Sequence, residues 1–268
     1  MAWLKAIVDG FLLSIQFFSV IPIRKEISID KKRLKNAILT FPLLGAAIGI
    51  SASLFLWVFY SFTPLSQFAI SILFFFYFIF ITGGIHLDGW TDTSDAYFSY
   101  RDQTRRLEIM KDPRVGTFGV LSLLSLLMFR FLFIFEFVQS LSGKDYFVIA
   151  IIPIFSRILM GTLLIYGPGM AKKEGLGFFF SEALSKKDGW IYFLYVIILL
   201  VSSIFIAKEV AFIISVFLFV FIILYYFATF TFKHAFGGLT GDTLGASIEG
   251  TETMLWLIVW LLHSYAMV

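Results

Sequence analysis

The sequence contains no cysteine, which excludes disulfides, thiolate nucleophiles and cysteine-ligated zinc or iron–sulfur sites. Charge is also scarce, because Asp, Glu, Lys and Arg make up only 15% of the 268 residues and the formal net charge is +3. The chain is rich instead in apolar residues, at 59%, with a mean hydropathy of +0.91. This is more apolar surface than one soluble core of this length could bury, so a soluble enzyme is not expected and a membrane must cover the excess.

The amino terminus lacks the small-residue cleavage pattern of a signal peptide. Its apolar stretch, residues 1–23, is interrupted by polar positions such as Asp9 and Gln16. We expect an amphipathic helix that lies in the membrane interface or inserts only shallowly. The basic residues that follow, from Arg24 to Lys35, are expected to anchor the chain to anionic lipid headgroups. Residues 1–36 are therefore predicted to form an interfacial amino-terminal segment.

Long apolar runs fill most of the remaining chain. A bilayer core about 30 Å thick needs roughly 20 apolar residues per helix; six segments reach or approach this length, and a shorter seventh ends the chain. Residues 1–268 are thus predicted to form a single all-α domain, a polytopic transmembrane helix bundle with about seven spans. The predicted spans are Ala37–Tyr60, Gln67–Thr82, Thr117–Phe137, Tyr146–Tyr166, Trp190–Ile206, Val210–Phe232 and Met254–Val268.

Lys and Arg are distributed unevenly among the connections between these spans. Segments 24–36, 83–116 and 167–189 hold 6, 5 and 4 of them, whereas segment 61–66 holds none. Because basic connections face the cytoplasm, these three segments and the turn at 233–253 are predicted to be cytoplasmic. We therefore expect a multi-pass protein of the cell (inner) membrane whose polar clusters all lie on the cytoplasmic side.

Three carboxylates follow the second span directly. Segment 83–95 reads GGIHLDGWTDTSD, which places Asp88, Asp92 and Asp95 at i, i+4 and i+7 on one stripe of a helix, opposite His86. Like charges this close repel by roughly a few tenths of a kcal/mol per pair even on an exposed helix, so a cation must offset them. Oxygen ligands suit Mg²⁺ or Mn²⁺, which normally bridge to substrate phosphates. A solvated acidic turn is the plainer alternative.

A second group of charges precedes the third span. Glu108 and Asp112 repeat the i, i+4 spacing, and Pro113 ends any helix at this point. The two acids are therefore expected at a helix terminus close to the membrane, where they can face the first stripe. Two carboxylate pairs surrounded by cations are what a two-metal displacement at phosphorus requires, and a ladder of salt bridges is the alternative. The flanking cations are Arg105, Lys111 and Arg114.

Two other features are weaker indications. Segment 236–245 (FGGLTGDTLG) puts Asp242 and two Thr hydroxyls in a glycine-rich turn whose backbone N–H groups can meet an anion, although a simple interhelical turn is an equal alternative. Arg130 and Arg157 lie within predicted spans, where a charge needs a partner or a polar cavity. Either they bind substrate, or they snorkel or pair with Glu136 or another acid.

Several segments, taken in order, resemble the cobalamin synthase (adenosylcobinamide-GDP ribazoletransferase) family. They are 83–95, 106–119 (RLEIMKDPRVGTFG) and 237–246 (GGLTGDTLGA), with a similar FFSVIP stretch at 17–22. The likeness covers nearly the whole chain. One departure lies at 91–96, where the family usually shows ADTADG and this chain has TDTSDA, with the acids intact.

The resemblance implies a Mg²⁺-dependent transferase that joins α-ribazole, or its 5′-phosphate, to adenosylcobinamide-GDP and releases GMP. The product is adenosylcobalamin or its 5′-phosphate, in the last step of nucleotide loop assembly. In this reaction a 5′-hydroxyl attacks the phosphorus on the cobinamide side of the diphosphate. The expected partners are these substrates and the lipid bilayer, with no nucleic acid. A homo-oligomer, or association with other corrinoid-assembly enzymes, is compatible with this interpretation.

The candidate side chains then fall into three groups, most of them in the predicted cytoplasmic acidic site region 83–116. The predicted metal ligands are Asp88, Asp92, Asp95, Glu108 and Asp112. The predicted catalytic residues are Asp95, as ligand or base, and Asp112. The predicted substrate-binding residues are Arg105, Lys111, Arg114, Thr240 and Asp242.

Two other functions are alternatives. A CDP-alcohol phosphotransferase acting on lipid also uses acids at helix ends, but its Asp-Gly-x-x-Ala-Arg core is absent, because Asp92 and Thr93 follow the segment 88–91 (DGWT). A transporter would place polar residues near the bilayer midplane across paired repeats. In this chain the acids crowd one predicted surface instead, which favours the transferase.

Overall fold

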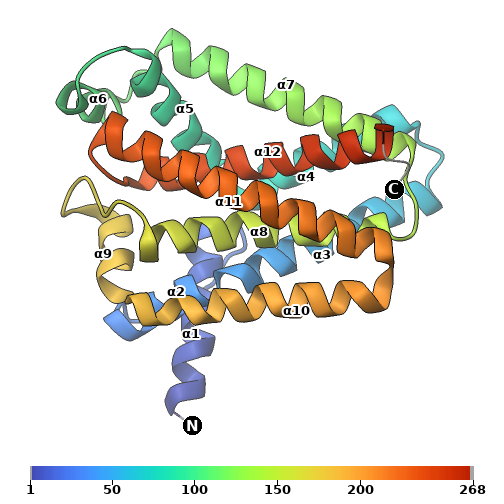
Figure 1. The fold of residues 1–268 in the computed structure, drawn as a ribbon, viewed down its shortest axis with the longest axis horizontal. Coiled ribbons are helices and arrows are strands. Elements are labelled where there is room, and N and C mark those ends of the chain that lie inside the picture. The colour runs from blue at the N-terminus through green and yellow to red at the C-terminus, as the bar shows by residue number, and fades with distance from the viewer. Residues whose placement is uncertain (1, 266–268) are drawn as a thin grey trace.

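The computed structural model describes residues 2–265 and is built almost entirely of helices (Figure 1). Among these residues there are twelve α-helices, one 3-10 helix and no β-strand, which confirms the all-α prediction. The helices are α1 (Ala2–Phe18), α2 (Lys31–Leu39), α3 (Phe41–Phe62), α4 (Gln67–Thr82), α5 (Ile85–Phe98), α6 (Gln103–Ile109), α7 (Thr117–Gln139), α8 (Asp145–Tyr166), α9 (Gly175–Ala183), η1 (Lys186–Gly189), α10 (Trp190–Ile206), α11 (Lys208–Phe236) and α12 (Gly241–Tyr265).

Five helical segments are long and apolar enough to cross a membrane: α3, α7, α8, α10 together with η1, and α11. Helix α8 lies at the centre, since 83% of its apolar window is buried, against 17% for η1 and α10. Glycine brings α3 close to it, because a Cβ at Gly45 would lie 2.5 Å from the carbonyl oxygen of Pro153. Large apolar side chains are exposed on the outer faces of α7, α10 and α11, which is the surface expected to meet lipid.

Helices α4 and α5 form a sixth apolar segment that is sharply broken. They meet at 87°, and the break falls at Gly83 and Gly84, whose φ angles of 65° and 72° strongly favour glycine. The acidic part of segment 83–116 is therefore a helix of its own, directed away from the axis of α4. We take α4 as the apolar span and α5 as lying outside it.

The seventh predicted span, Met254–Val268, belongs to a longer helix, and its last residues, 266–268, lie outside the described residues. Helix α12 begins much earlier, at Gly241, and carries Glu249 and Glu252 in its first half. It is not among the helices that qualify by length and hydropathy, yet it packs against α7 and α8 and runs beside the spanning helices (Figure 1). The bundle therefore has five spans by length and hydropathy, six with the bent pair, and seven with α12.

Helix α1 crosses one end of the bundle instead of running along it (Figure 1). Its buried Asp9 pairs with Lys25 at 2.6 Å and with Arg33 at 3.0 Å. Farther along the same basic run, Lys35 pairs with Asp188 at 2.5 Å. Lys25 and Arg33 thus form ion pairs within the amino-terminal segment, and Lys35 joins this segment to the bundle. Attraction to lipid headgroups stays a prediction for the other basic residues of the run.

Candidate active site

Helix α5 carries the three carboxylates on one face, as the spacing predicts. The helix runs through all of them without a break, with Asp88 in its first turn. His86 is 3% exposed, and its ring stacks with that of Phe18 at 5.9 Å between centroids. It therefore lies in the interior, away from the acidic stripe, as expected.

The first turn of α12 adds a fourth carboxylate, that of Asp242. Here α5 and α12 touch backbone to backbone, because a Cβ at Gly89 would lie 2.7 Å from the carbonyl oxygen of Asp242. Thr240 and Thr243 cap the helix reciprocally: the N–H of Thr243 donates to Oγ1 of Thr240 at 3.1 Å, and the N–H of Thr240 to Oγ1 of Thr243 at 2.8 Å. The predicted glycine-rich turn is thus the capped start of a helix that points Asp242 toward the stripe.

Asp92 lies at the centre of this acidic group. Burial raises its pKa to about 6, and the charges of Asp88, Asp242 and Asp95 push it in the same direction. The pKa of Asp242 is raised as well, first by burial and then by Asp88. Both residues lie outside the apolar spans, at the polar end of the bundle. A divalent cation would offset the negative charge that these four neighbouring carboxylates concentrate in one place.

Asp95 is held at the start of α7. The N–H of Gly119 donates to its carboxylate at 3.1 Å, and the carboxylate lies directly against Gly116, where any side chain would collide with it. This contact with the amino-terminal turn of α7 orients the Asp95 carboxylate. Gly116 and Gly119 thereby connect the segment 106–119 to the segment 83–95.

The structure does not bring Glu108 and Asp112 into the acidic group. Glu108 pairs with Arg105 at 2.6 Å and Asp112 with Arg114 at 2.7 Å, all with exposed side chains. The hydrogen bonds from Arg114 lower the pKa of Asp112 to about 2. Neither acid is among the charges that act on Asp92. The salt-bridge alternative describes their present contacts, and their metal-binding and catalytic roles stay predictions.

The donor set of the acidic group fits a hard divalent cation, because it offers only carboxylate oxygens. Its geometry is open, however: among residues 2–265, no three His, Asp or Glu side chains are gathered closely enough to ligate a metal as they stand. The raised pKa of Asp92 reflects burial first and the charges of the neighbouring carboxylates second. A bound cation would therefore draw together side chains that already share one face.

Two polar cavities adjoin the acidic group. The first, of about 350 Å³, is lined by Lys111, Lys172, Glu174 and the turn 239–242. The second, of about 780 Å³, is open and lies between Asp95, Arg101 and Arg105. The structure thus brings the predicted substrate-binding residues Arg105, Lys111, Thr240 and Asp242 to these cavities. It leaves Arg114 bonded to Asp112.

The sequence analysis did not identify Lys172 or Arg101 as site residues. Lys172 reaches the first cavity because its loop is hydrogen-bonded to the segment 237–246. The N–H of Ala171 donates to the carbonyl of Leu239 at 2.8 Å, and the N–H of Leu239 donates to the carbonyl of Gly169 at 2.7 Å. The only sequence signal for these two residues is that they lie in the basic connections that predict the cytoplasmic side.

Arg130 and Arg157 have acidic partners on α12. Arg130 pairs with Glu249 at 2.6 Å and donates to the Thr253 hydroxyl at 2.8 Å. Arg157 pairs with Glu252, and both groups are buried. Neither arginine pairs with Glu136. Each pairs with another acid, which was one of the alternatives open from the sequence. These pairs join α12 to α7 and to α8.

The fold and the site together define a class, a polytopic transmembrane helix bundle with an acidic site at one end. The chain matches the model of the cobalamin-5-phosphate synthase family over residues 10–260. Relatives named adenosylcobinamide-GDP ribazoletransferase include that of Geobacillus sp. (strain WCH70), 44% identical over 99% of this chain and 100% of the relative. The relative from Geobacillus kaustophilus (strain HTA426) is 39% identical over 98% of this chain and 100% of its own length. The relative from Clostridioides difficile (strain 630) is 34% identical over 94% of this chain and 97% of its own length.

The chain belongs to the cobalamin-5-phosphate synthase family, as its resemblance predicts. It is therefore an enzyme, a transferase of cobalamin biosynthesis. No solved structure matches the chain.

Proposed function

We propose that this protein joins ribazole, or ribazole 5′-phosphate, to adenosylcobinamide-GDP with release of GMP, in a Mg²⁺-dependent reaction at the cytoplasmic face of the cell membrane. The names of the relatives support the substrates. The structural observation that carries the proposal is the crowding of four carboxylates where α5 meets α12. The pKa of Asp92 is raised to about 6 there, first by burial and then by the charges of Asp88, Asp242 and Asp95. Such a group is suited to bind Mg²⁺ together with the phosphates of a substrate.

Asp88, Asp92 and Asp242 are the proposed core of the metal site, because they face one another across the contact of α5 and α12. When bound, Mg²⁺ would neutralise these carboxylates and the diphosphate and polarise the phosphorus that is attacked. Glu108 and Asp112 are the candidate ligands of a second ion. Each of them must exchange its arginine partner for that ion, so they are proposed to bind only with the substrate present.

The phosphates are proposed to lie in the two polar cavities beside the acids. Lys111 and Lys172 line the first cavity with Thr240 and the amino terminus of α12, which can bind an anion. Lys111 is paired with Glu174 at 2.6 Å, so it is proposed to exchange this partner for a phosphate oxygen. Arg105 lines the second cavity together with Arg101, and guanidinium groups bind phosphate in a bidentate manner. Arg114 is a further proposed cation, which is released for substrate when Asp112 changes partner.

Asp95 is the proposed general base. It lines the second cavity, and the N–H of Gly119 fixes its carboxylate. The attacking hydroxyl would give its proton to this carboxylate while its oxygen bonds to the phosphorus on the cobinamide side. The bond from that phosphorus to the GMP oxygen then breaks, and GMP leaves with its negative charge neutralised by the surrounding cations.

The cytoplasmic assignment is supported by the arrangement of the basic connections. Helices α6 and α9 and the turn between α11 and α12 lie at the same end of the bundle (Figure 1). They belong to the connections 83–116, 167–189 and 233–253, which hold 5, 4 and 1 Lys and Arg residues. Because such segments are retained on the cytoplasmic side, soluble substrates made in the cell would reach the acids directly.

The proposal is tested with purified protein in lipid nanodiscs, supplied with adenosylcobinamide-GDP, α-ribazole or its 5′-phosphate, and Mg²⁺ or EDTA. GMP release is measured by chromatography. We expect turnover with Mg²⁺ only, and its loss in Asp88→Ala but not in Glu209→Ala, an exposed acid at the opposite end. Asp112→Ala tests the second ion. Folded protein that releases no GMP, or an Asp88→Ala variant with full turnover, would contradict the proposal.

A further inference from the structure

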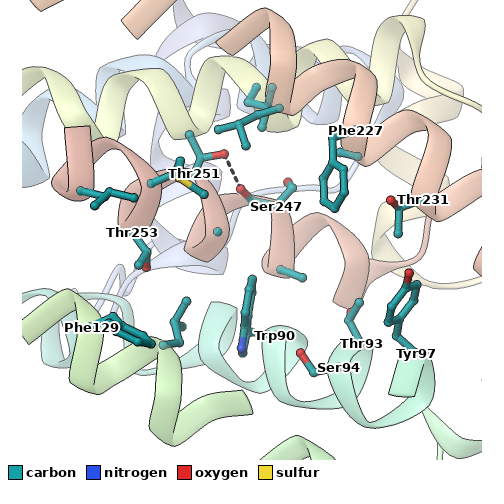
Figure 2. Close-up of a pocket in the computed structure, with 18 of the residues that line it drawn as sticks. Trp90, Thr93, Ser94, Tyr97, Phe129, Phe227, Thr231, Ser247, Thr251 and Thr253 are labelled. Atoms are coloured by element: carbon teal, nitrogen blue, oxygen red, sulfur yellow. Dashed lines mark hydrogen bonds between the residues drawn. The ribbon is translucent and has the colours of Figure 1, made fainter. Parts of the chain in front are cut away.

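A large apolar cavity lies on the side of α5 opposite the carboxylates. It measures about 650 Å³ and lies between α5, α7, α11 and α12, within the size range of ligand pockets. Figure 2 shows Trp90 projecting into it from α5, with Phe129 and Phe227 on its two walls. Nothing in the proposed transfer reaction uses this space.

The polar atoms of the cavity are mostly bonded within the chain. The indole N–H of Trp90 donates to Ser122 at 2.9 Å, the Ser247 hydroxyl to the carbonyl of Leu244 at 2.7 Å, and the Thr251 hydroxyl to the carbonyl of Ser247 at 2.6 Å. The Thr253 hydroxyl accepts from the buried Arg130. A nucleotide or another highly polar molecule would therefore lose its hydrogen bonds to water on entry and regain few of them.

The cavity has one end that is more polar than the other. Thr93, Tyr97 and Thr231 lie together at this end (Figure 2), and the buried Thr93 hydroxyl has no hydrogen-bond partner in the structure. Tyr97 is near the carboxyl end of α5, so this end faces the cytoplasmic loops. Beside it, the guanidinium of Arg106 lies 5.3 Å from the centre of the Tyr97 ring.

The two walls are membrane-spanning helices with exposed apolar side chains next to the cavity. Met128 and Phe129 on α7 are 70% and 57% exposed, and Tyr226 and Phe227 on α11 are 67% and 65% exposed. The apolar surface of the cavity therefore continues into the surface that faces the bilayer. The molecules that meet this opening in a membrane are lipids.

We infer that the cavity binds one acyl chain of an anionic glycerophospholipid. The chain lies between α7 and α11 against Trp90, its ester oxygen accepts from the Thr93 hydroxyl, and its phosphate lies near Arg106. The apolar body of the cavity, the buried Thr93 donor and the Arg106 cation follow one another in the order in which a lipid carries its acyl chain, ester and phosphate. Because the chain packs against α5, its occupancy supports the helix that bears Asp88 and Asp92.

Quenching of Trp90 fluorescence by phospholipids brominated along the acyl chain tests the site directly. Protein in nanodiscs of such lipids is compared with Trp90→Phe, so that the difference isolates Trp90. We expect Trp90 to be quenched in the wild type and to lose most of this quenching in Ala228→Phe, which fills the cavity from α11. Ser215→Phe, an equal enlargement at an exposed position of the same helix, is the matched control and keeps the quenching.

Leu224→Trp fills the same cavity from another position and replaces Ala228→Phe in the test if that variant does not fold. The fluorescence of the added Trp is measured in the double variant Leu224→Trp with Trp90→Phe and subtracted. Arg106→Gln is expected to reduce the preference for anionic over zwitterionic brominated lipid. Absence of Trp90 quenching in the wild type, or equal quenching in the filled and control variants, would overturn the inference. The readout needs no turnover, so it is independent of the proposed reaction.

Discussion

The backbone of Gly89 on α5 lies against the backbone of Asp242 on α12, with room for a hydrogen but not for a methyl group: a Cβ at Gly89 would lie 2.7 Å from the Asp242 carbonyl oxygen and 3.0 Å from its Cα. This contact joins two motifs separated by about 150 residues. It is the reason that Asp242 shares a site with Asp88 and Asp92.

Gly89→Ala is therefore expected to push α12 away from α5 and to reduce GMP release strongly. Overpacking of this kind costs about 1–3 kcal/mol, which the bundle should survive, so the loss of turnover should exceed the loss of folded protein. Turnover and the thermal unfolding midpoint are measured together. Gly143→Ala, at a loop position where an added Cβ meets nothing within 4 Å, is the control. Equal activity in the two variants would show that the contact is not needed.

The pH dependence of stability provides a second prediction. Folding raises the pKa of Asp92 from 3.8 to about 6, so the folded chain holds this proton more tightly than the unfolded chain. Asp92 therefore stabilises the metal-free protein below pH 3.8, and that contribution is lost as the pH rises through about 6. Asp9 and Asp112, whose pKa values are lowered by basic partners, act in the opposite direction.

Comparison with Asp92→Asn isolates this residue from the others. With EDTA, the wild type is expected to lose thermal stability relative to Asp92→Asn between about pH 4 and pH 6. At pH 7, Mg²⁺ should restore the thermal stability of the wild type and change that of Asp92→Asn less. If the two proteins change in parallel across this range, burial and the neighbouring carboxylates do not raise the pKa of Asp92 in the folded protein.

The sequence predicted those features that depend on short-range spacing. Asp88, Asp92 and Asp95 share a stripe because the helical period fixes their directions, and the apolar runs became the long helices. Asp242 could not be placed with them, because its position depends on the contact at Gly89, which is a tertiary contact. Glu108 and Asp112 have the same spacing as the first stripe, but nearby arginines compete for them, and spacing does not rank such partners.

Lys172 provides a third prediction and illustrates the same limit, because only the pairing of its loop with Leu239 brings it to the first cavity. If it binds a substrate phosphate, Lys172→Ala should raise KM for adenosylcobinamide-GDP about tenfold, since a hydrogen bond to a charged group contributes about 1.5–3 kcal/mol. The value of kcat should change less, and Lys172→Arg should recover much of the loss. The adjacent, exposed Lys173 provides the control: Lys173→Ala is expected to leave KM unchanged, and equal effects of the two alanine variants would mean that only the general positive field matters.

The buried pairs on α12 lead to the last prediction. Arg130 and Glu249 are 4% and 5% exposed and lie 2.6 Å apart, so Arg130→Met alone leaves an unpaired carboxylate in the bundle. Breaking such a pair costs about 3–5 kcal/mol, and the thermal unfolding midpoint should fall far more than in Arg24→Gln, which alters an exposed arginine.

Replacing both partners, with Arg130→Met and Glu249→Leu, should restore much of the stability, because no charge is then left unpaired. Turnover distinguishes two roles for the pair. If it only stabilises the packing of α12, the stable double variant should keep most of its GMP release, because the contact at Gly89 still places Asp242. If the double variant is stable but inactive, Arg130 or Glu249 takes part in the reaction itself, and the purely structural role that their burial indicates would be wrong.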